Sequence, residues 1–274
     1  MKKLVWLCVL AMALSCMFGA AAEESEVYWS FGVPMTQLYS DYMVLVNRDT
    51  PLDKDYEPED LVKVTEVMRA TSAQISLRQV AADALKRMFE AADAEGYTLY
   101  LKSGYRSYGT QTTTYNNYLA RNNNVDDGVV APPGTSEHQT GLSCDVLNRD
   151  YASRSRMTTD FSETLEAQWL KENAPSYGFV IRYPEEKADI TKTIFEPWHL
   201  RYVGREAAGY MKVNDLCLEE FTDRWQTAVA QFQGEGGDVD AQIEQEKLEE
   251  SRGPESRVLD VYGEDGDAEV SLSL

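Results

Sequence analysis

Residues 76–101 limit the fold more than any other stretch of this sequence. Apolar residues recur at helical spacing over Ser76–Glu95, a capping box of Ser76 and Gln79 opens the segment, and Gly96 closes it. Residues 97–101 follow at once and are rich in β-forming side chains. The sequence therefore predicts a long helix that leads directly into a strand.

Further helical and β-rich segments follow in an irregular order. The patterns predict helices over residues 108–121, 161–173, 205–212 and 218–232, and strands near residues 142–147, 179–183 and 198–203. In the helix at 161–173 we expect Phe161, Leu165, Trp169 and Leu170 to share one face. Because helices and strands do not alternate regularly, we expect an α+β fold, with an antiparallel sheet flanked by helices in a single domain.

The first 22 residues have the pattern of an export signal. Lys2 and Lys3 precede an apolar run over residues 4–18, and small residues end at Ala22. The run is short for a membrane span, so we expect cleavage after Ala22 and a location outside the cell or in the cell envelope. Two alternatives stay open: a retained membrane anchor, and lipidation at Cys16. Contact with a membrane is expected only in those two cases.

Charge and composition divide the remaining chain into two parts. Residues 23–233 have the composition of one folded domain, whereas residues 234–274 carry 13 acidic against 3 basic side chains. Such an acidic segment buries little apolar area, so we expect a disordered tail with at most a short helix around residues 242–250. The net charge of −20 argues against binding to nucleic acid or another polyanion.

Two cysteines, Cys144 and Cys217, remain once the predicted signal is removed. In an oxidising compartment they are able to form a disulfide, and they are equally able to remain buried, inert thiols. The sequence does not distinguish the two cases.

The chain has two histidines, and each lies beside a carboxylate. His138 precedes Asp145 by seven residues, and His199 follows Glu196 by three. A catalytic zinc site needs about three nitrogen or oxygen ligands and one open position. His138, Asp145 and His199 form such a set, and Glu196 would then lie close enough to act as a general base.

Other interpretations of the same residues exist. A single histidine is more often a satisfied core or surface residue than a metal ligand, and an acid near it is often incidental. Cys144 is a rival ligand. If residues 142–147 form a strand, however, Cys144 and Asp145 point to opposite faces and do not reach one ion together.

Several motifs, in order, resemble one family of bacterial cell-wall enzymes. The motifs are Ser136-x-His138-x-x-Gly141-x-x-x-Asp145, Glu196-x-Trp198-His199, Ser103-Gly104-Tyr105-Arg106-Ser107 with Gln111 and Tyr115, and Leu45-Val46-Asn47-Arg48 with Pro51-Leu52. Together they resemble the VanY-type D-alanyl-D-alanine carboxypeptidases over about residues 45–204. The resemblance implies a zinc DD-peptidase fold, Zn²⁺ as cofactor and a peptidoglycan stem peptide as substrate.

The resemblance also implies roles for individual residues. His138, Asp145 and His199 would bind zinc, Glu196 would be the general base, and Arg106 would stabilise the oxyanion or the substrate carboxylate. Gln111 and Ser136 are candidates for binding the substrate. Ser143 and Cys144 stand where the family usually has small apolar residues before the aspartate; both are compact, so we expect the ligand geometry to be kept.

Three further functions remain open at this point. The same site would serve an L,D-carboxypeptidase that trims tetrapeptide stems, or an endopeptidase that cuts peptide crosslinks. A non-catalytic, zinc-containing wall-binding module is the third. Retention of Glu196 and Arg106 argues against that module, because a purely structural zinc site requires neither.

Overall fold

The computed structural model describes residues 27–64 and 68–252. The predicted export signal at residues 1–22, including Cys16, lies outside the described residues. Among the described helices, none combines the length and the apolar character that crossing a membrane requires.

A four-stranded antiparallel sheet forms the centre of the domain. Its strands lie in the order β3-β4-β6-β5, and their bounds are β3 Leu99–Ser103, β4 Ser143–Asn148, β5 Phe179–Ile181 and β6 His199–Tyr202. A second, two-stranded sheet pairs β1 (Leu61–Lys63) with β2 (Ser76–Arg78). The predicted α+β fold with an antiparallel sheet is thereby confirmed.

The two faces of the central sheet differ in chemistry. On β4 and β6, Cys144, Val146 and Leu200 belong to the main hydrophobic core. Because side chains alternate along a strand, Asp145 and His199 point to the opposite face. This polar face of the sheet is where the candidate site is built.

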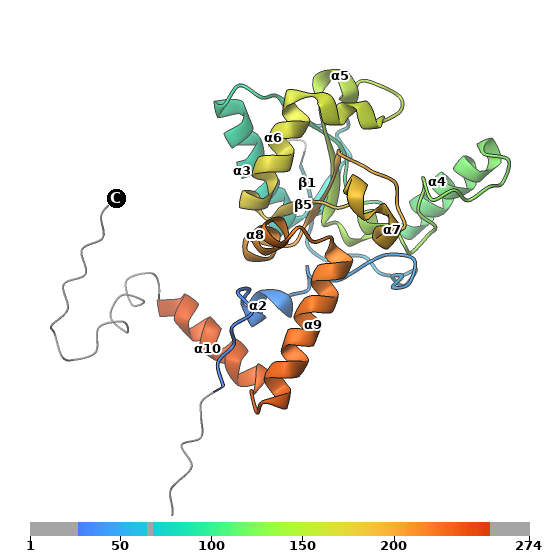
Figure 1. The fold of residues 1–274 in the computed structure, drawn as a ribbon. Helices are drawn as coiled ribbons and strands as arrows, with labels where there is room; N and C mark the ends of the chain where they lie inside the picture. Colours follow the sequence, from blue (N-terminus) through green and yellow to red (C-terminus); the bar gives the residue numbers. More distant parts are fainter. Residues whose placement is uncertain (1–26, 65–67, 253–274) are drawn as a thin grey trace, which may run out of the picture.

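Helices cover the apolar face and extend from the edges. In Figure 1, α3 (Gln79–Ala94), α6 (Leu165–Asn173) and α8 (Arg205–Asn214) lie together on one side of the sheet, and α4 (Tyr108–Arg121) projects from the other side. The other short helices of the described residues are α2 Met35–Leu38, η1 Glu137–Thr140, α5 Arg149–Ala152, η2 Thr159–Glu163, η3 Ala174–Tyr177, η4 Glu185–Lys187 and α7 Ala188–Thr191. Two longer helices, α9 Leu218–Gly234 and α10 Val239–Arg252, come after the last strand in the chain. The predicted bounds of the helix at 108–121 are confirmed.

The start of the long helix differs from the expectation. Ser76 does not cap it, because residues 76–78 form β2 and Ser76 pairs with Lys63 of β1. The helix α3 begins at Gln79, and its N-cap residue Arg78 makes no side-chain capping bond. Pairing with a distant strand therefore outweighs the local capping signal.

The segment at 161–173 is also not one helix. A short 3₁₀ turn, η2, ends before Thr164, whose side chain accepts a hydrogen bond from the Ala167 backbone N–H and caps α6. The break rotates the two parts, so Phe161, Trp169 and Leu170 are buried, whereas Leu165 is 66% exposed. The expectation of one shared apolar face is wrong for Leu165.

Part of the acidic segment forms a helix that contacts the beginning of the domain. α10 covers residues 239–252, a longer span than the short helix expected within a disordered tail, and residues 253–274 lie outside the described residues. The carboxylate of Glu246 accepts hydrogen bonds from the backbone N–H groups of Met35 and Thr36, at 3.0 and 2.8 Å. These bonds satisfy donors at the start of α2 and hold α10 against it.

Candidate metal centre

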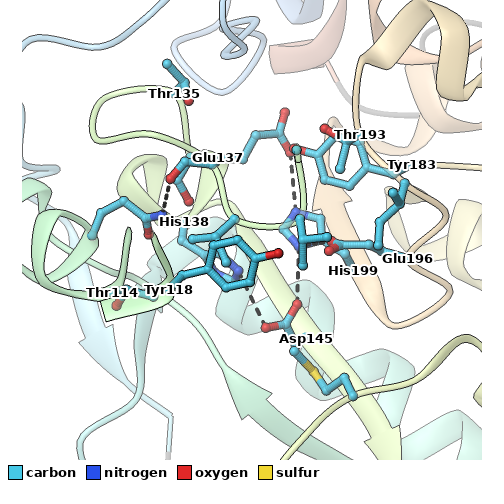
Figure 2. A pocket seen from close by; sticks show the side chains of 18 of the residues that line it. Thr114, Tyr118, Thr135, Glu137, His138, Asp145, Tyr183, Thr193, Glu196 and His199 are labelled. Carbon is cyan, nitrogen blue, oxygen red and sulfur yellow. Dashed lines mark hydrogen bonds and ion pairs between the residues drawn. The ribbon is translucent and has the colours of Figure 1, made fainter. Parts of the chain in front are cut away.

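The candidate site lies in a cleft of about 760 Å³ over the polar face of the sheet. Figure 2 shows its labelled side chains converging from η1, β4, β6 and α4, with further residues from the segment before β6. The predicted site residues His138, Asp145, His199, Glu196, Arg106, Gln111 and Ser136 all line this cleft.

Three of these side chains meet at one point. Ligand atoms of His138, Asp145 and His199 all lie within 4.8 Å of one another, and all three residues are buried. The Oδ2 atom of Asp145 lies 3.5 Å from Nε2 of His138, and its Oδ1 atom lies 3.2 Å from Nδ1 of His199. The two imidazole rings are nearly perpendicular, with centroids 4.9 Å apart.

Glycines allow the backbone to bring His138 to this point. A Cβ at Gly104 would lie 2.5 Å from the backbone oxygen of Ser76, so the close approach of these two segments requires glycine. Gly141 has a φ of 67° and ends η1 two residues before β4 begins. The chain can therefore turn from His138 into the strand that carries Asp145.

The second nitrogen of each ring points away from the meeting point. Nδ1 of His138 lies 2.8 Å from the backbone oxygen of Gly104, so the Nδ1–H group donates a hydrogen bond to that oxygen. The unprotonated Nε2 then has a lone pair free for a metal ion. In His199 the arrangement is reversed: Nδ1 faces Asp145, and Nε2 faces Glu137. Two imidazole nitrogens and one carboxylate oxygen form the donor set of a catalytic zinc site. The second nitrogen of each imidazole ring already faces an acceptor of the protein, as is usual for zinc-binding histidines. The residues present fit zinc.

Burial and neighbouring charges set the protonation of these groups. Burial, with help from the Arg106 charge, lowers the pKa of His138 to about 3, so this ring is neutral and able to bind a cation. Burial opposes the charge on His199, but the carboxylates of Asp145 and Glu137 outweigh it and raise the pKa of His199 to about 9. Burial likewise opposes the charge on Asp145, yet the two histidines lower its pKa to about 2. A cation that binds here replaces the proton of His199.

Glu196 lies beside this cluster, and the pKa of its carboxyl group is raised. Its Oε2 atom is 3.7 Å from Nδ1 of His199, and the backbone N–H of His199 donates to the Glu196 carbonyl oxygen in the turn that leads into β6. Burial raises the pKa of the Glu196 carboxyl to about 7. A carboxyl group with a pKa near neutrality is suited to accept and return a proton.

Arg106 is held at the rim of the cleft by Gln111. The Arg106 guanidinium donates to Oε1 of Gln111 at 2.8 Å, and the Gln111 side-chain amide donates to the backbone oxygen of Ala131 at 2.6 Å. The Arg106 backbone N–H donates to the carbonyl oxygen of His138 at 3.0 Å. Gln111 is therefore engaged in orienting Arg106, and contact of Gln111 with a substrate stays a prediction.

Ser136 precedes η1 and lines the cleft with little exposure. Among the described residues, none forms a hydrogen bond with the hydroxyl of Ser136, so this group is available to a ligand.

A buried charge network behind His199 was not predicted. The fully buried carboxylate of Glu137 accepts hydrogen bonds from Arg182 and Arg201, each at 2.7 Å, and Arg182 also contacts Glu219. The two arginines hold the pKa of Glu137 well below its usual range, although burial alone would raise it. The sequence did contain a signal, because arginine in the apolar segments 179–183 and 198–203 requires a buried partner.

Within the described part of the chain, Cys144 and Cys217 are both buried free thiols. Cys144 lies in the hydrophobic core, on the face of β4 opposite to Asp145, so it does not compete for the cluster. Of the two cases that the sequence left open, the structure has the unpaired one.

Comparison with known proteins agrees with this geometry. The family model for VanY, described as D-alanyl-D-alanine carboxypeptidase, matches residues 74–205. The Bacillus subtilis (strain 168) protein YodJ is 43% identical over 197 residues, which cover 70% of this chain and 71% of YodJ.

Solved structures extend the comparison to the fold. The LD-carboxypeptidase LdcB has 45% sequence identity and a TM-score of 0.61, and the match covers 65% of this chain and 84% of LdcB. A mutant of the vancomycin-resistance D,D-pentapeptidase VanY, solved in complex with Zn(II), has 32% identity and a TM-score of 0.54, covering 66% of this chain and 98% of that one. These likenesses confirm an enzyme of the metallo-carboxypeptidase class. The chain belongs to the VanY family of D-alanyl-D-alanine carboxypeptidases.

Proposed function

We propose that this protein is a zinc-dependent carboxypeptidase that releases the terminal D-alanine from peptidoglycan stem peptides ending in D-alanyl-D-alanine. One observation carries the proposal: His138, Asp145 and His199 meet at one point in a cleft that also holds Glu196. The description of the matching family supports the D-alanyl-D-alanine substrate. The Zn(II) complex of the similar VanY supports the metal.

The zinc ion would be held by Nε2 of His138, Nδ1 of His199 and a carboxylate oxygen of Asp145. When bound there, zinc supplies a Lewis acid that polarises the scissile carbonyl and lowers the pKa of water to about 7. The protein residues around it then have separate tasks.

Glu196 moves the proton. Its carboxylate, beside the cluster, accepts a proton from the attacking water as the oxygen of that water bonds to the scissile carbonyl carbon. The protonated Glu196 then donates this proton to the leaving nitrogen as the C–N bond breaks, and free D-alanine departs. A carboxyl pKa of about 7, caused by burial, suits both directions of transfer.

Arg106 stabilises negative charge on the substrate. Gln111 and the backbone of His138 fix its position at the cleft, so its guanidinium is preorganised. A preorganised donor of this kind commonly contributes about 3 kcal/mol to lowering a barrier. The free hydroxyl of Ser136 is placed to bind the peptide or its terminal carboxylate.

Amino-acid release from defined stem peptides tests the proposal. Purified protein is incubated with a pentapeptide stem that ends in D-alanyl-D-alanine, with and without a chelator. We expect free D-alanine, its loss with the chelator and its return with added zinc. Release that is insensitive to chelation, or binding of the peptide with no release, would contradict the proposal. Paired stems instead of free alanine would indicate an endopeptidase.

L,D-carboxypeptidase activity is a second candidate, and one observation favours it. The LD-carboxypeptidase LdcB is 45% identical to this chain, against 32% for the D,D-pentapeptidase VanY. A parallel assay with a tetrapeptide stem, in which D-alanine follows an L-configured lysine or a meso-diaminopimelate centre, separates the two activities. The larger kcat/KM identifies the preferred stem.

The proposed reaction takes place outside the cytoplasm. This location rests on the signal pattern at residues 1–22. Mass spectrometry of the secreted and envelope fractions tests it, because cleavage after Ala22 gives a mature chain that begins at Glu23.

A further inference from the structure

The outward nitrogen of His199 faces a carboxylate that lies deeper in the protein. Nε2 of His199 is buried and has no hydrogen-bond partner among the described residues. The Oε2 atom of Glu137 lies 3.7 Å from this nitrogen. Figure 2 shows the His199 ring between two carboxylates, Asp145 on the side of the cluster and Glu137 on the other side.

The hydrogen bonds of Glu137 leave its Oε2 atom facing His199. Arg182 and Arg201 both donate to its other oxygen, Oε1, each at 2.7 Å. The Ser143 hydroxyl donates to Oε2 at 3.0 Å. Oε2 therefore keeps acceptor capacity for one more donor, and Nε2 of His199 is the buried donor that lacks a partner.

The two arginines are themselves fixed by distant parts of the chain. Arg182 makes two hydrogen bonds to Glu219 of α9, at 2.8 and 2.6 Å. Arg201 donates to the backbone oxygens of Tyr42 and Val44, at 3.0 and 2.6 Å. These contacts leave the Glu137 carboxylate little freedom to rotate.

We propose that Glu137 is a positioning residue that accepts the Nε2–H of His199 and thereby presents the Nδ1 lone pair of His199 to the metal. A carboxylate on the outer nitrogen of a metal-binding imidazole fixes both its tautomer and the orientation of its ring. The partner of His138 is different in kind, a backbone oxygen on Nδ1, so the two rings bind through opposite nitrogens.

The proposal rests on the zinc site of the proposed function, and substitution of Glu137 tests it. In E137Q the amide oxygen stays with the two arginines that donate to Oε1, which turns the NH₂ group toward His199. An amide donor then faces the Nε2–H donor. The matched control is E219Q, which removes the same charge from the other side of Arg182 without facing His199.

Zinc affinity, measured by competition with a chromophoric chelator, is the first readout. We expect E137Q to bind zinc at least about tenfold more weakly than the wild type, the lower end of the effect of losing such a partner. E219Q should stay within about threefold, because it leaves the acceptor in place. Wild-type affinity in E137Q, or an equal loss in E219Q, would overturn the proposal. Failure of the wild type itself to bind zinc would instead refute the proposed function.

Nitrogen NMR of the zinc-loaded wild type gives a second readout that does not depend on the stability of a variant. The chain has two histidines, so the spectrum contains two imidazole rings. We expect the His199 ring to carry its proton on Nε2, with slow solvent exchange and a downfield proton resonance, and the His138 ring to carry its proton on Nδ1. A His199 ring with an unprotonated Nε2, or with a freely exchanging proton there, would overturn the proposal.

Discussion

Asp145 and His199 are directly paired residues on neighbouring antiparallel strands, β4 and β6. Such pairs lie on the same face of a sheet with their side chains in reach of each other, and here Oδ1 of Asp145 lies 3.2 Å from Nδ1 of His199. Strand register therefore brings together two residues that are 54 positions apart. Because a slip by one residue would turn one of them to the apolar face, the register of this pair is required for the site.

Glu196→Gln should strongly slow turnover and leave zinc binding intact. The variant keeps the shape of the side chain and loses the group that accepts the proton. We expect kcat to fall by a factor of about 10²–10⁴, the usual range for a general base. D-alanine release and zinc content are measured on the same samples, with the surface variant Glu186→Gln as control. Unchanged kcat in Glu196→Gln would remove this residue from the mechanism.

Arg106→Gln should slow the reaction mainly through kcat. The guanidinium is preorganised by Gln111, and removal of a comparable oxyanion donor costs about 3 kcal/mol of barrier. Steady-state kinetics on the stem peptide measure the effect. Arg87→Gln, an exposed arginine on α3, serves as the control. A rise in KM with unchanged kcat would instead assign Arg106 to the binding of the substrate carboxylate.

The rate should fall on the acidic side as Glu196 becomes protonated. Burial raises the pKa of this carboxyl to about 7 in the metal-free site, and a bound cation beside it favours the charged form. The acidic limb of kcat/KM should therefore have its midpoint at or below a pH of about 7. Zinc content is measured at each pH, so that loss of metal is separated from protonation. A rate that stays constant down to pH 4 would contradict the assignment.

The same carboxyl group should make the metal-free protein less stable as the pH rises. Its pKa in the folded state, about 7, is above the ordinary glutamate value of 4.5, so the folded protein holds this proton where the unfolded chain has lost it. The stability that this carboxyl group contributes is fully present below a pH of about 4.5 and is lost as the pH rises through about 7. Urea unfolding of the metal-free protein should show Glu196→Gln more stable than the wild type at pH 8 and equal at pH 4. Equal free energies of unfolding for the two proteins at pH 8 would contradict a raised pKa of the Glu196 carboxyl.

Metal removal should leave the fold intact and lower its stability. The main core lies on the apolar face of the sheet, away from the cluster. Zinc at about 100 times its Kd should raise the free energy of unfolding by about 2.7 kcal/mol. Thermal unfolding with and without chelator measures the difference, and His199→Ala should show none. Loss of all secondary structure on chelation would show that the site is required for folding.

Glu246→Gln should loosen α10 from the domain. The carboxylate caps two backbone N–H groups of α2, and the loss of such a cap typically costs about 1 kcal/mol. Hydrogen exchange should become faster over residues 239–252, with little change in catalysis, because the helix does not line the cleft. Glu249→Gln, on the same helix, is the control. Equal protection in both variants would show that Glu246 does not hold α10.

Sequence patterns predicted elements well where the signals were local. The helix at 108–121 has a Ser107 side chain that accepts from the Thr110 backbone N–H, a capping contact within three residues. The predicted strands lie within a few residues of β3, β4, β5 and β6. Ser76 misled the prediction because its partner, Lys63, lies on another strand and no short window of sequence contains both.

The candidate site was predictable in part. Residue types, together with the resemblance to the VanY-type family, pointed to His138, Asp145 and His199, and the structure brings these three together. Glu137 was missed because its partners, Arg182 and Arg201, are 45 and 64 positions away. The hydrogen bond between Gln111 and Arg106 also needed the structure, because an amide beside a helix start has no local pattern that reveals its partner.

An anomalous difference map recorded at the zinc edge from crystals of the zinc-loaded protein tests the central claim most directly. We expect one strong peak per chain, about 2.0–2.2 Å from Nε2 of His138, Nδ1 of His199 and a carboxylate oxygen of Asp145. A peak away from these three side chains, or no peak in crystals grown with excess zinc, would contradict the assignment of this cluster as the metal centre.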